Sequence, residues 1–330
     1  MARPRAAGAH GRSRRRLPGL DRVAELSRRV LLTGAAGFIG RPALAALLDG
    51  GADVHAVGRG PAPDWALRPA EWHRRDLLAP GAAAALVAEV APEAVLHLAW
   101  ETTPGAYWTS PANEAWLRAS LELAEAAAAR GARVVTAGTC AEYDWSAGWL
   151  SEAGTPLAPA TLYGRTKQAL GSSLEELGRA SGASVAHGRV FFLYGPHEAP
   201  ARLVPSVTTA LLRGERAPTT DGVQRRDFMH VDDVAAALVA LLDADAVTGP
   251  VNIASANPVA VRDVVAAIAD EVGRPDLVGW GEVERGASEP DLVAGDAARL
   301  RDEVGFSPRY GLRDGIRATV GWWRGRMGVR

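Results

Sequence analysis

The chain has 330 residues, of which 48% are hydrophobic and 23% charged, and its formal net charge is −1 at pH 7, a composition typical of soluble globular proteins. No run of about 18 apolar residues is free of charges or helix breakers, so the sequence predicts no membrane span. The single cysteine, Cys140, excludes an internal disulfide and argues against a cysteine-based metal site, and we expect a cytoplasmic protein.

The N-terminal segment differs in charge from the rest of the chain. Residues 1–29 contain nine Arg against Asp21 and Glu25, a net charge of +7, so the remaining residues sum to −8. The segment lacks the apolar stretch of a secretory signal, and we interpret residues 1–28 as a disordered Arg-rich extension. A nucleic-acid tail and a targeting peptide are the alternatives, although the acidic body argues against a nucleic-acid partner.

From residue 29 onward, short apolar runs alternate with longer segments rich in Ala and Leu. Buried strands are predicted at residues 29–34, 52–58, 93–100, 132–138 and 184–196. Helices are predicted between them, at residues 38–50, 80–90, 113–131 and 160–181. This alternation predicts βαβ units, and therefore an α/β fold with a Rossmann-type doubly wound parallel sheet over residues 29–195.

Beyond Gly195 and Pro196 the alternation becomes less regular. Connections rich in Gly and Pro separate the predicted helices, which lie near residues 202–213, 231–243, 261–273 and 311–325. We therefore expect residues 196–330 to form a smaller C-terminal α/β lobe that binds the substrate and is partly entwined with the first domain.

A glycine-rich turn joins the first predicted strand to the first helix. In LLTGAAGFIG, residues 31–40, Gly34, Gly37 and Gly40 allow a tight turn and a close approach of a pyrophosphate to the backbone. The free N–H groups and the positive dipole end of the following helix favour an anion there. Because the turn follows a strand, opens a helix and begins a βαβ series, it predicts a dinucleotide site.

The end of the second strand bears on the choice of dinucleotide. An acidic residue there binds the ribose 2′-hydroxyl of NAD, whereas a basic residue accommodates the 2′-phosphate of NADP. The sequence VHAVGRG has Gly58 and Arg59 at this place. We therefore favour NADP as the cofactor, with NAD as the alternative.

Lys167, in TLYGRTKQAL, is the only lysine in a chain that otherwise uses arginine. It follows Tyr163 by four residues, so the two side chains project from one face of the predicted helix. A nearby ammonium stabilises a phenolate and lowers the pKa of the tyrosine, whose ordinary value is about 10. Thr139, at the carboxyl end of the strand in ARVVTAGTC, is the candidate hydroxyl donor opposite the tyrosine. Together these three residues predict a site that handles a carbonyl group.

These motifs carry a resemblance to a known family. TGAAGFIG, HLAW, AGTCAEYDW, YGRTK, FFLYGP and RRDFMHVDDV occur in the order and approximate spacing of the extended short-chain dehydrogenase/reductases. Over about residues 29–325 the chain closely resembles the nucleotide-sugar epimerase/dehydratase branch of that family. The resemblance implies an NAD(P)-dependent oxidoreductase of deoxysugar biosynthesis, which takes a nucleotide sugar and forms a homodimer through helices 112–129 and 160–181.

The resemblance also implies the roles of individual residues. The implied catalytic set is Thr139, Tyr163 and Lys167. The implied cofactor-binding residues are Gly34, Gly37, Phe38, Ile39, Gly40, Arg59, Asp76, Leu77, Leu98, Ala99, Tyr163 and Lys167. The implied substrate-binding residues are Arg226, whose position often contacts the diphosphate of the nucleotide sugar, together with Phe192 and Trp100.

Several departures from the family pattern narrow the chemistry. Family dehydratases carry an acidic pair directly after the catalytic Thr, where this chain has Cys140 and Ala141, and Glu142 comes one position later. Dehydration is therefore disfavoured. Phe192 and Trp116 stand where many relatives have Asn, so we expect a more apolar pocket that suits a deoxygenated sugar.

Three functional hypotheses remain open from the sequence. The first is an NAD(P)H-dependent reductase of a nucleotide-linked keto-sugar, an NDP-4-keto-6-deoxyhexose 4-ketoreductase in which Tyr163 is the general acid. The second is a nucleotide-sugar 4-epimerase that retains NAD. The third is a non-catalytic cofactor-sensing or RNA-associated protein, which has no use for a tuned tyrosine. No metal site is predicted, because His97 and His230 are interpreted as satisfied buried histidines.

Overall fold

The computed structural model describes residues 27–66, 70–287 and 289–329. The predicted Arg-rich extension, residues 1–28, lies outside the described residues except for its last two positions. In the described part of the chain, no helix is long and apolar enough to cross a membrane.

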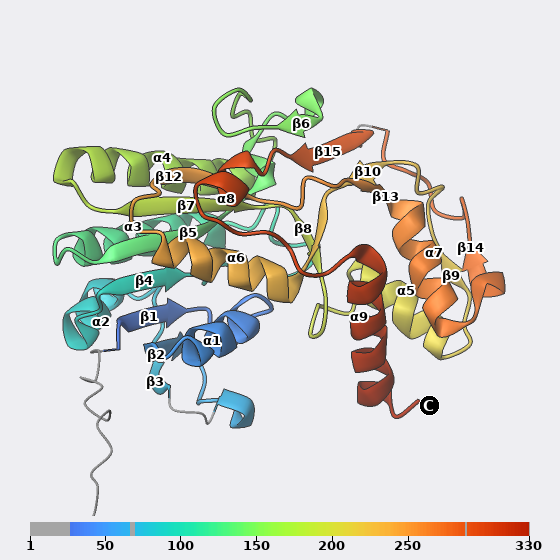
Figure 1. Ribbon diagram of the computed structural model, residues 1–330, viewed down its shortest axis with the longest axis horizontal. Helices are drawn as coiled ribbons and strands as arrows, with labels where there is room; N and C mark the ends of the chain where they lie inside the picture. The colour runs from blue at the N-terminus through green and yellow to red at the C-terminus, as the bar shows by residue number, and fades with distance from the viewer. Residues whose placement is uncertain (1–26, 67–69, 288, 330) are drawn as a thin grey trace, which may run out of the picture.

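A seven-stranded sheet forms the centre of the molecule (Figure 1). Every pair of neighbouring strands in it is parallel. Its strands, in spatial order, are β12 (Gly249–Ile253), β7 (Val185–Val190), β5 (Arg133–Thr139), β4 (Ala94–His97), β1 (Arg29–Thr33), β2 (Asp53–Gly58) and β3 (Glu71–Arg74). The order confirms the predicted doubly wound Rossmann-type sheet, in which the chain winds outward in two directions from β1.

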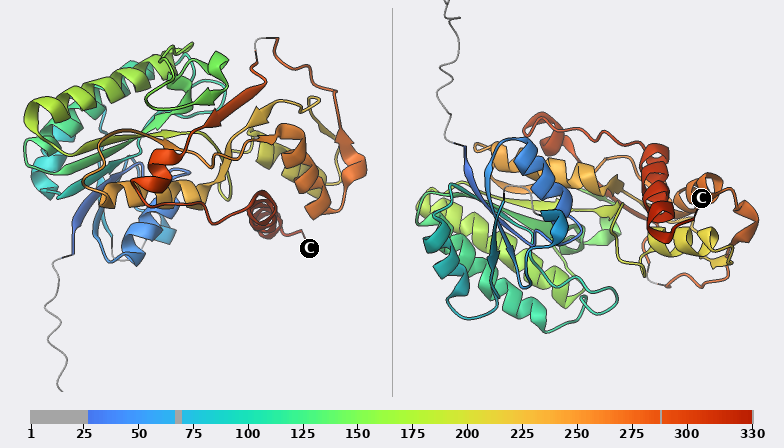
Figure 2. Two further views of the ribbon diagram at one scale, coloured as in Figure 1. Left: turned by 45° about the horizontal axis from the view of Figure 1, so that its top comes forward. Right: turned by 90° about the horizontal axis from the view of Figure 1, so that it is seen from below.

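Helices cover both faces of this sheet, because its central strands are apolar on both sides. Every residue of β5 is buried, as are the last four of β1. Figure 2 shows helices on both faces of the sheet. The first pair is α1 (Gly40–Asp49) and α6 (Val231–Asp243), and the three on the opposite face are α2 (Ala82–Val90), α3 (Ala112–Ala128) and α4 (Leu162–Ser181).

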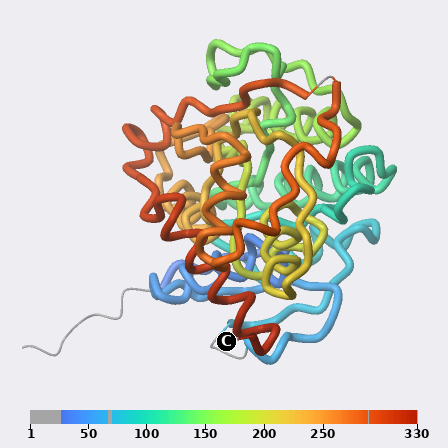
Figure 3. Tube along the Cα trace, turned by 90° about the vertical axis from the view of Figure 1, so that its right-hand side faces the viewer, coloured from blue at the N-terminus to red at the C-terminus, as the bar shows by residue number. Residues whose placement is uncertain are grey.

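The remaining elements form a smaller lobe beside the carboxyl ends of the main strands. Its core lies among α5 (Leu203–Leu212), α7 (Val261–Val272) and α9 (Leu312–Met327), which face the viewer in Figure 3. Short strands connect the lobe to the main sheet. One sheet contains β13 (Val259–Ala260), β10 (Arg225–Arg226), β15 (Leu292–Gly295) and β6 (Trp149–Leu150). Two smaller sheets pair β8 (Phe192–Tyr194) with β11 (Phe228–His230), and β9 (Ala217–Pro218) with β14 (Val278–Gly279). The short helix α8 is Ala298–Asp302.

The chain crosses between the two parts more than once. After β8 and α5 it returns to supply α6 and β12 to the main sheet, and β6 from the first half pairs with β15 of the second half. The predicted strand 184–196 is divided, since Phe191 separates β7 from β8. The sequence prediction also missed β3, because Glu71–Arg74 is an edge strand with exposed polar positions and no apolar run.

Candidate active site

The glycine-rich turn leaves β1 and enters α1 at the point where the order of the strands reverses. Gly34 has a φ of +70°, and a Cβ on it would come within 2.7 Å of the Ala99 nitrogen. A Cβ on Gly40 would collide with the Gly34 carbonyl oxygen, and the N–H of Gly37 donates to that same oxygen at 2.9 Å. Phe38 and Ile39 follow, both partly buried. The turn thus has the close backbone approach that a dinucleotide pyrophosphate requires.

A buried hydrogen-bond network fixes the segment that follows β4. The N–H groups of Leu98 and Ala99 both donate to Thr33 Oγ1 at 3.2 Å. Thr33 Oγ1 lies 2.7 Å from His97 Nδ1, and His97 Nε2 lies 2.7 Å from Ser120 Oγ. Burial, with a smaller contribution from the charge of Lys167, lowers the pKa of His97 to about 3. His97 is therefore a neutral histidine with both ring nitrogens engaged, as the sequence predicted. The same prediction was wrong for His230, whose Nε2 is buried without a hydrogen-bond partner among the described residues.

The carboxyl ends of β2 and β3 carry basic side chains. Arg59 is exposed directly after β2, and its carbonyl oxygen accepts from Arg74 Nε at 3.2 Å. Asp76 is exposed, and its Oδ1 accepts from the Leu78 N–H at 3.1 Å, while Leu77 is buried. The second strand therefore ends beside two arginines.

Thr139 and Tyr163 are brought together by a close approach of α4 to the end of β5. Thr139 ends β5, and Tyr163 is the second residue of α4. Between them, a Cβ on Gly164 would collide with the Ala141 carbonyl oxygen, so a larger residue there would push the helix away. Thr161 Oγ1 caps α4 by accepting from the Gly164 N–H at 3.1 Å.

The environment of Tyr163 changes one expectation from the sequence. We predicted that Lys167 lowers the pKa of Tyr163. Instead, desolvation raises the pKa of Tyr163 well above its ordinary value, and the neighbouring Tyr107 adds to the rise, while a hydrogen bond with Thr139 opposes it. Tyr163 is therefore held in its protonated form.

Lys167 is buried one helical turn further along α4, with 4% of its surface exposed. Its Nζ donates to the Ala137 carbonyl oxygen at 2.6 Å and lies 3.7 Å from the centre of a Trp100 ring. Burial lowers the pKa of Lys167 to about 7, although the charge of Glu142 opposes this shift. The ammonium is directed to these two groups, which explains why it does not dominate the pKa of the tyrosine.

The Glu142 side chain is directed into the protein interior beneath Thr139. Its carboxylate is fully buried and accepts from the Thr139 N–H at 2.8 Å and from Arg189 Nε at 2.8 Å. His187 Nε2 lies 3.0 Å from the same carboxylate. Burial alone would raise the pKa of Glu142, but His187 and Arg189 hold it below its usual value. Glu142 therefore anchors the backbone of Thr139 and is not presented as a proton donor to the site.

Aromatic side chains surround Tyr163. The Tyr107 ring meets it edge-on at 4.9 Å between centroids, and the Trp108 ring does so at 5.8 Å. Trp100 donates its Nε1 hydrogen to Asn113 Oδ1 at 2.7 Å, which fixes the indole over Lys167. Trp100, which the sequence predicts to bind the substrate, thus lies against Lys167.

Arg226 and Phe192 lie together on the side of the small lobe. The Arg226 guanidinium lies 5.6 Å from the centre of the Phe192 ring. Arg226 is 4% exposed, and its Nη2 donates to Glu289 Oε1 at 2.7 Å. The charge that the family resemblance assigns to a diphosphate is therefore paired with a glutamate of this chain.

Glu198 is a residue of this region that the sequence reasoning missed. It lies on the loop after β8, 8% exposed, and its Oε2 is a buried oxygen without a hydrogen-bond partner among the described residues. Burial raises the pKa of Glu198 to about 8, against the opposing charge of Arg202. Arg202 in turn lies 5.1 Å from the centre of the Tyr107 ring, which links Glu198 to the aromatic surroundings of Tyr163. In the sequence, Glu198 is visible only as an acidic residue two positions after Gly-Pro in YGPHEAP, and this pattern does not indicate a functional role.

Comparisons with known proteins agree with this geometry. Residues 30–254 match the model of the NAD dependent epimerase/dehydratase family. The GDP-6-deoxy-D-mannose reductase of Pseudomonas aeruginosa is 27% identical over 321 residues, which cover 92% of this chain and 99% of that protein. The dTDP-glucose 4,6-dehydratase of Streptomyces antibioticus is 32% identical over 174 residues, 51% of this chain and 50% of that protein, so this match spans about half of the dehydratase. The solved structure of MoeE5 in complex with UDP-glucose and NAD is 32% identical, with a TM-score of 0.74 over 91% of this chain and 99% of that one.

Proposed function

Because the chain belongs to the NAD dependent epimerase/dehydratase family, we propose that it is an NADPH-dependent reductase of a nucleotide-linked keto-sugar, an NDP-4-keto-6-deoxyhexose 4-ketoreductase. The proposal includes the catalytic roles of Thr139, Tyr163 and Lys167 and the preference for NADP over NAD. It also includes binding of the nucleotide sugar near Arg226, Phe192 and Trp100.

One observation carries the proposal, namely which ionisable side chains near Thr139 can donate a proton to a bound sugar. Elimination of water from a hexose needs an acid and a base beside the sugar ring, in addition to the tyrosine. Ala141 has no ionisable group, and burial raises the pKa of the Cys140 thiol, so that it stays protonated. Glu142 is turned into the protein towards Arg189. What remains close to Thr139 is Tyr163, held protonated, and this supports a reaction in which one proton is donated to a carbonyl oxygen.

Each of the three residues has a proposed role in this reaction. In the proposed reaction Thr139 Oγ1 holds the keto oxygen of the sugar, and Tyr163 donates its hydroxyl proton to that oxygen as the carbonyl carbon is reduced. Lys167 binds the ribose on the cofactor side of the site. The reduced nicotinamide, when bound, supplies the hydride.

The residues present fit a dinucleotide. Side chains at Gly34 or Gly40 would block the backbone cradle, and the N-terminal end of α1 offers free N–H groups to a pyrophosphate. Arg59, directly after β2, lies next to Arg74, the last residue of β3, where a 2′-phosphate would be recognised. This pair supports NADP as the preferred cofactor.

The test follows NADPH absorbance with purified full-length protein and a freshly prepared dTDP-4-keto-6-deoxyhexose. We expect oxidation that requires the sugar, and that Tyr163→Phe lowers at least about 100-fold, the usual scale of general acid catalysis. The matched control is Tyr310→Phe, whose ring packs against that of His230, and it should leave the rate near that of the wild type. An Arg59→Asp variant should shift the preference towards NADH.

The nucleotide-sugar 4-epimerase is the second candidate function. It would use the same Thr, Tyr and Lys, but with NAD retained as an internal hydride carrier. Absence of NADPH oxidation, together with NAD(H) that stays bound through purification and interconversion of a nucleotide-sugar pair, would replace the reductase with the epimerase.

A further inference from the structure

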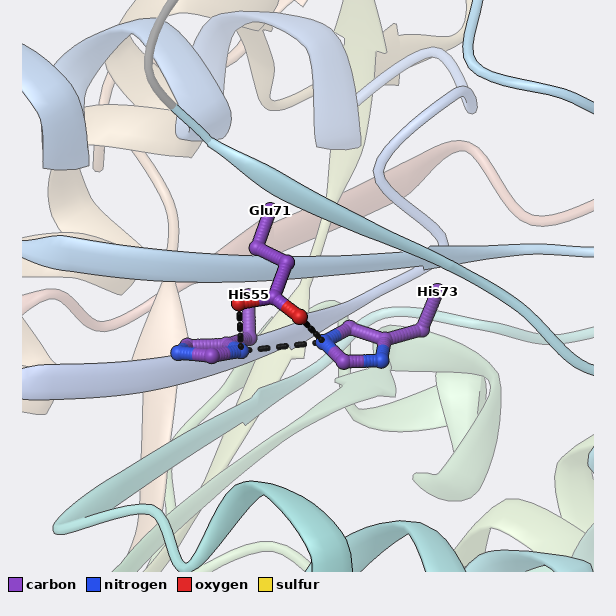
Figure 4. Close-up of side chains that lie close together, drawn as sticks. All are labelled: His55, Glu71 and His73. Atoms are coloured by element: carbon purple, nitrogen blue, oxygen red, sulfur yellow. Dashed lines mark hydrogen bonds and ion pairs between the residues drawn. The ribbon is translucent and has the colours of Figure 1, made fainter.

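We propose that His55, Glu71 and His73 form a binding site for a divalent transition-metal ion such as Zn²⁺, at the edge of the main sheet. Figure 4 shows the three side chains converging from β2 and β3. His55 Nδ1 lies 2.9 Å from His73 Nε2. The Glu71 carboxylate lies 3.6 Å from the first of these nitrogens and 3.7 Å from the second. The site is separate from the reductase chemistry proposed above.

The register of the two strands brings these residues together. His55 pairs with Glu71, and Val57 pairs with His73. Because side chains alternate across a strand, residues 55, 71 and 73 all project from the same face of the sheet. The sequence predicted no metal site, since β3 was not recognised and the histidines are 18 positions apart in the chain.

Among the described residues, the two facing nitrogens hydrogen-bond only to each other. On the far side of the ring, His73 Nδ1 lies 3.3 Å from Glu89 Oε1, and His55 Nε2 lies 3.7 Å from Asp53 Oδ2. The Glu89 carboxylate is close enough to hold the ring hydrogen of His73 on Nδ1, whereas Asp53 is at ion-pair distance from His55. With the hydrogen on Nδ1, His73 Nε2 offers a lone pair towards His55 Nδ1, and a cation between the two nitrogens would replace the hydrogen bond that joins them. A carboxylate behind a ligating histidine is a recurrent feature of metal sites.

The separations match a tetrahedral metal. Zinc lies at about 2.0–2.2 Å from nitrogen and carboxylate ligands, which in tetrahedral geometry places two ligand atoms roughly 3.3–3.5 Å apart. The three observed separations, 2.9, 3.6 and 3.7 Å, bracket that value. The two imidazoles are 9% and 8% exposed, whereas the Glu71 side chain is 65% exposed, so a fourth position faces solvent. Two imidazoles and a carboxylate favour zinc and its neighbours over Mg²⁺ or Ca²⁺.

The surrounding charges favour a dication at this place. Arg75 pairs with Glu89 at 2.6 Å, and Arg29 pairs with Asp53 at 3.1 Å. Both arginines are thus directed to the carboxylates behind the histidines, not to the nitrogens that face each other. Glu71 pairs with neither arginine in the described part of the chain, so its charge is available to an ion. A bound metal would join the edge strand β3 to β2.

The test measures zinc binding by the full-length protein carrying no polyhistidine tag. After equilibrium dialysis against micromolar Zn²⁺, bound metal is quantified by mass spectrometry, and the affinity is obtained by competition with a chromophoric chelator. We expect stoichiometric binding to the wild type and to His197→Gln, a matched control outside the cluster. Glu89→Gln should lower the affinity about 10–100-fold, as expected for a partner behind a ligand, and His73→Gln should lower it further.

The Glu71→Gln variant serves as a second test in case a histidine variant fails to fold. The Glu71 side chain is largely exposed, so this substitution should leave folding intact. We expect it to bind zinc more weakly than the wild type and to change the visible spectrum of the Co²⁺-substituted protein. Zinc should raise the unfolding temperature of the wild type more than that of Glu71→Gln. Absence of stoichiometric zinc in the wild type, or equal affinities of the wild type, Glu71→Gln and His73→Gln, would overturn the proposal.

Discussion

Replacing Glu198 with Gln tests whether the loop after β8 holds a neutral carboxylic acid. The structure raises the pKa of Glu198 to about 8 from an ordinary value of 4.5. A group whose folded-state pKa is raised in this way binds a proton in the folded state that the unfolded chain has lost. Folding stability therefore decreases as the pH rises from about 4.5 to about 8.

The magnitude follows from the size of that shift. Each unit corresponds to about 1.36 kcal/mol, so a shift of about 3.5 units gives an upper bound of roughly 5 kcal/mol above pH 8. Side-chain relaxation toward Arg202 reduces this value, and we expect Glu198→Gln to be more stable than the wild type by about 2–5 kcal/mol at pH 8.5. Near pH 5 the carboxyl is protonated and resembles the amide, so the difference should shrink to less than about 1 kcal/mol.

The assay is urea unfolding of both proteins at half-unit steps from pH 5 to pH 9. Glu175→Gln serves as the matched control, because Glu175 is exposed on α4 and should give a difference that is small and independent of pH. A Glu198→Gln difference that stays constant across the pH range would refute the reasoning, since it would show that Glu198 is ionised in the folded protein throughout.

Three further predictions concern the catalytic set and its supports. Lys167→Met should abolish reductase activity yet stabilise the fold below pH 7, and this gain in stability should fade as the pH rises towards 10.5. The reason is that the pKa of the buried lysine is lowered to about 7, so the lysine destabilises the folded state most at a pH where it is protonated in both the folded and the unfolded protein. Urea unfolding at pH 6 and pH 9 checks this, and an equal gain in stability at the two pH values would contradict it. Glu142→Gln should lower the free energy of unfolding by about 3–5 kcal/mol, because it leaves the buried Arg189 charge without its partner. Thermal and chemical unfolding measure this loss, and a loss below about 1 kcal/mol would be inconsistent with the pairing of Glu142 and Arg189. Glu289→Gln should release Arg226 and lower the KM for the nucleotide sugar with little change in kcat, whereas an unchanged KM would indicate that Arg226 does not meet the substrate.

The sequence predicts those parts of the fold that depend on short motifs or on hydrophobic periodicity within one segment of the chain. The glycine turn after β1 and the buried runs of β1, β4 and β5 each lie within about ten consecutive residues, and their periodicity is sufficient to identify them. The pairing of Tyr163 with Lys167 is equally local, because four residues span one turn of a helix. These features led to the doubly wound sheet, which the structure confirms.

Other features depend on contacts between distant segments and left no local signal. β3 is an edge strand whose alternating residues are polar, so neither its existence nor the meeting of its histidine with that of β2 follows from periodicity. The pairing of Arg226 with Glu289 spans 63 positions, and the burial of Glu198 depends on how its loop packs. The error about the pKa of Tyr163 has the same origin, because desolvation is a property of the assembled pocket and not of the helix that carries the residue.

Burial shifts the pKa values of Tyr163 and Lys167 in opposite directions. It raises the pKa of Tyr163 and lowers that of Lys167, so burial disfavours both the phenolate and the ammonium. Donation of the Tyr163 proton to a carbonyl oxygen leaves that phenolate, and removal of a proton from an alcohol starts from it, so the same charge must be stabilised in both directions. A reductase and an epimerase therefore make the same demand on this pair of residues, and retention of NAD(H) is the property that separates the two proposed functions.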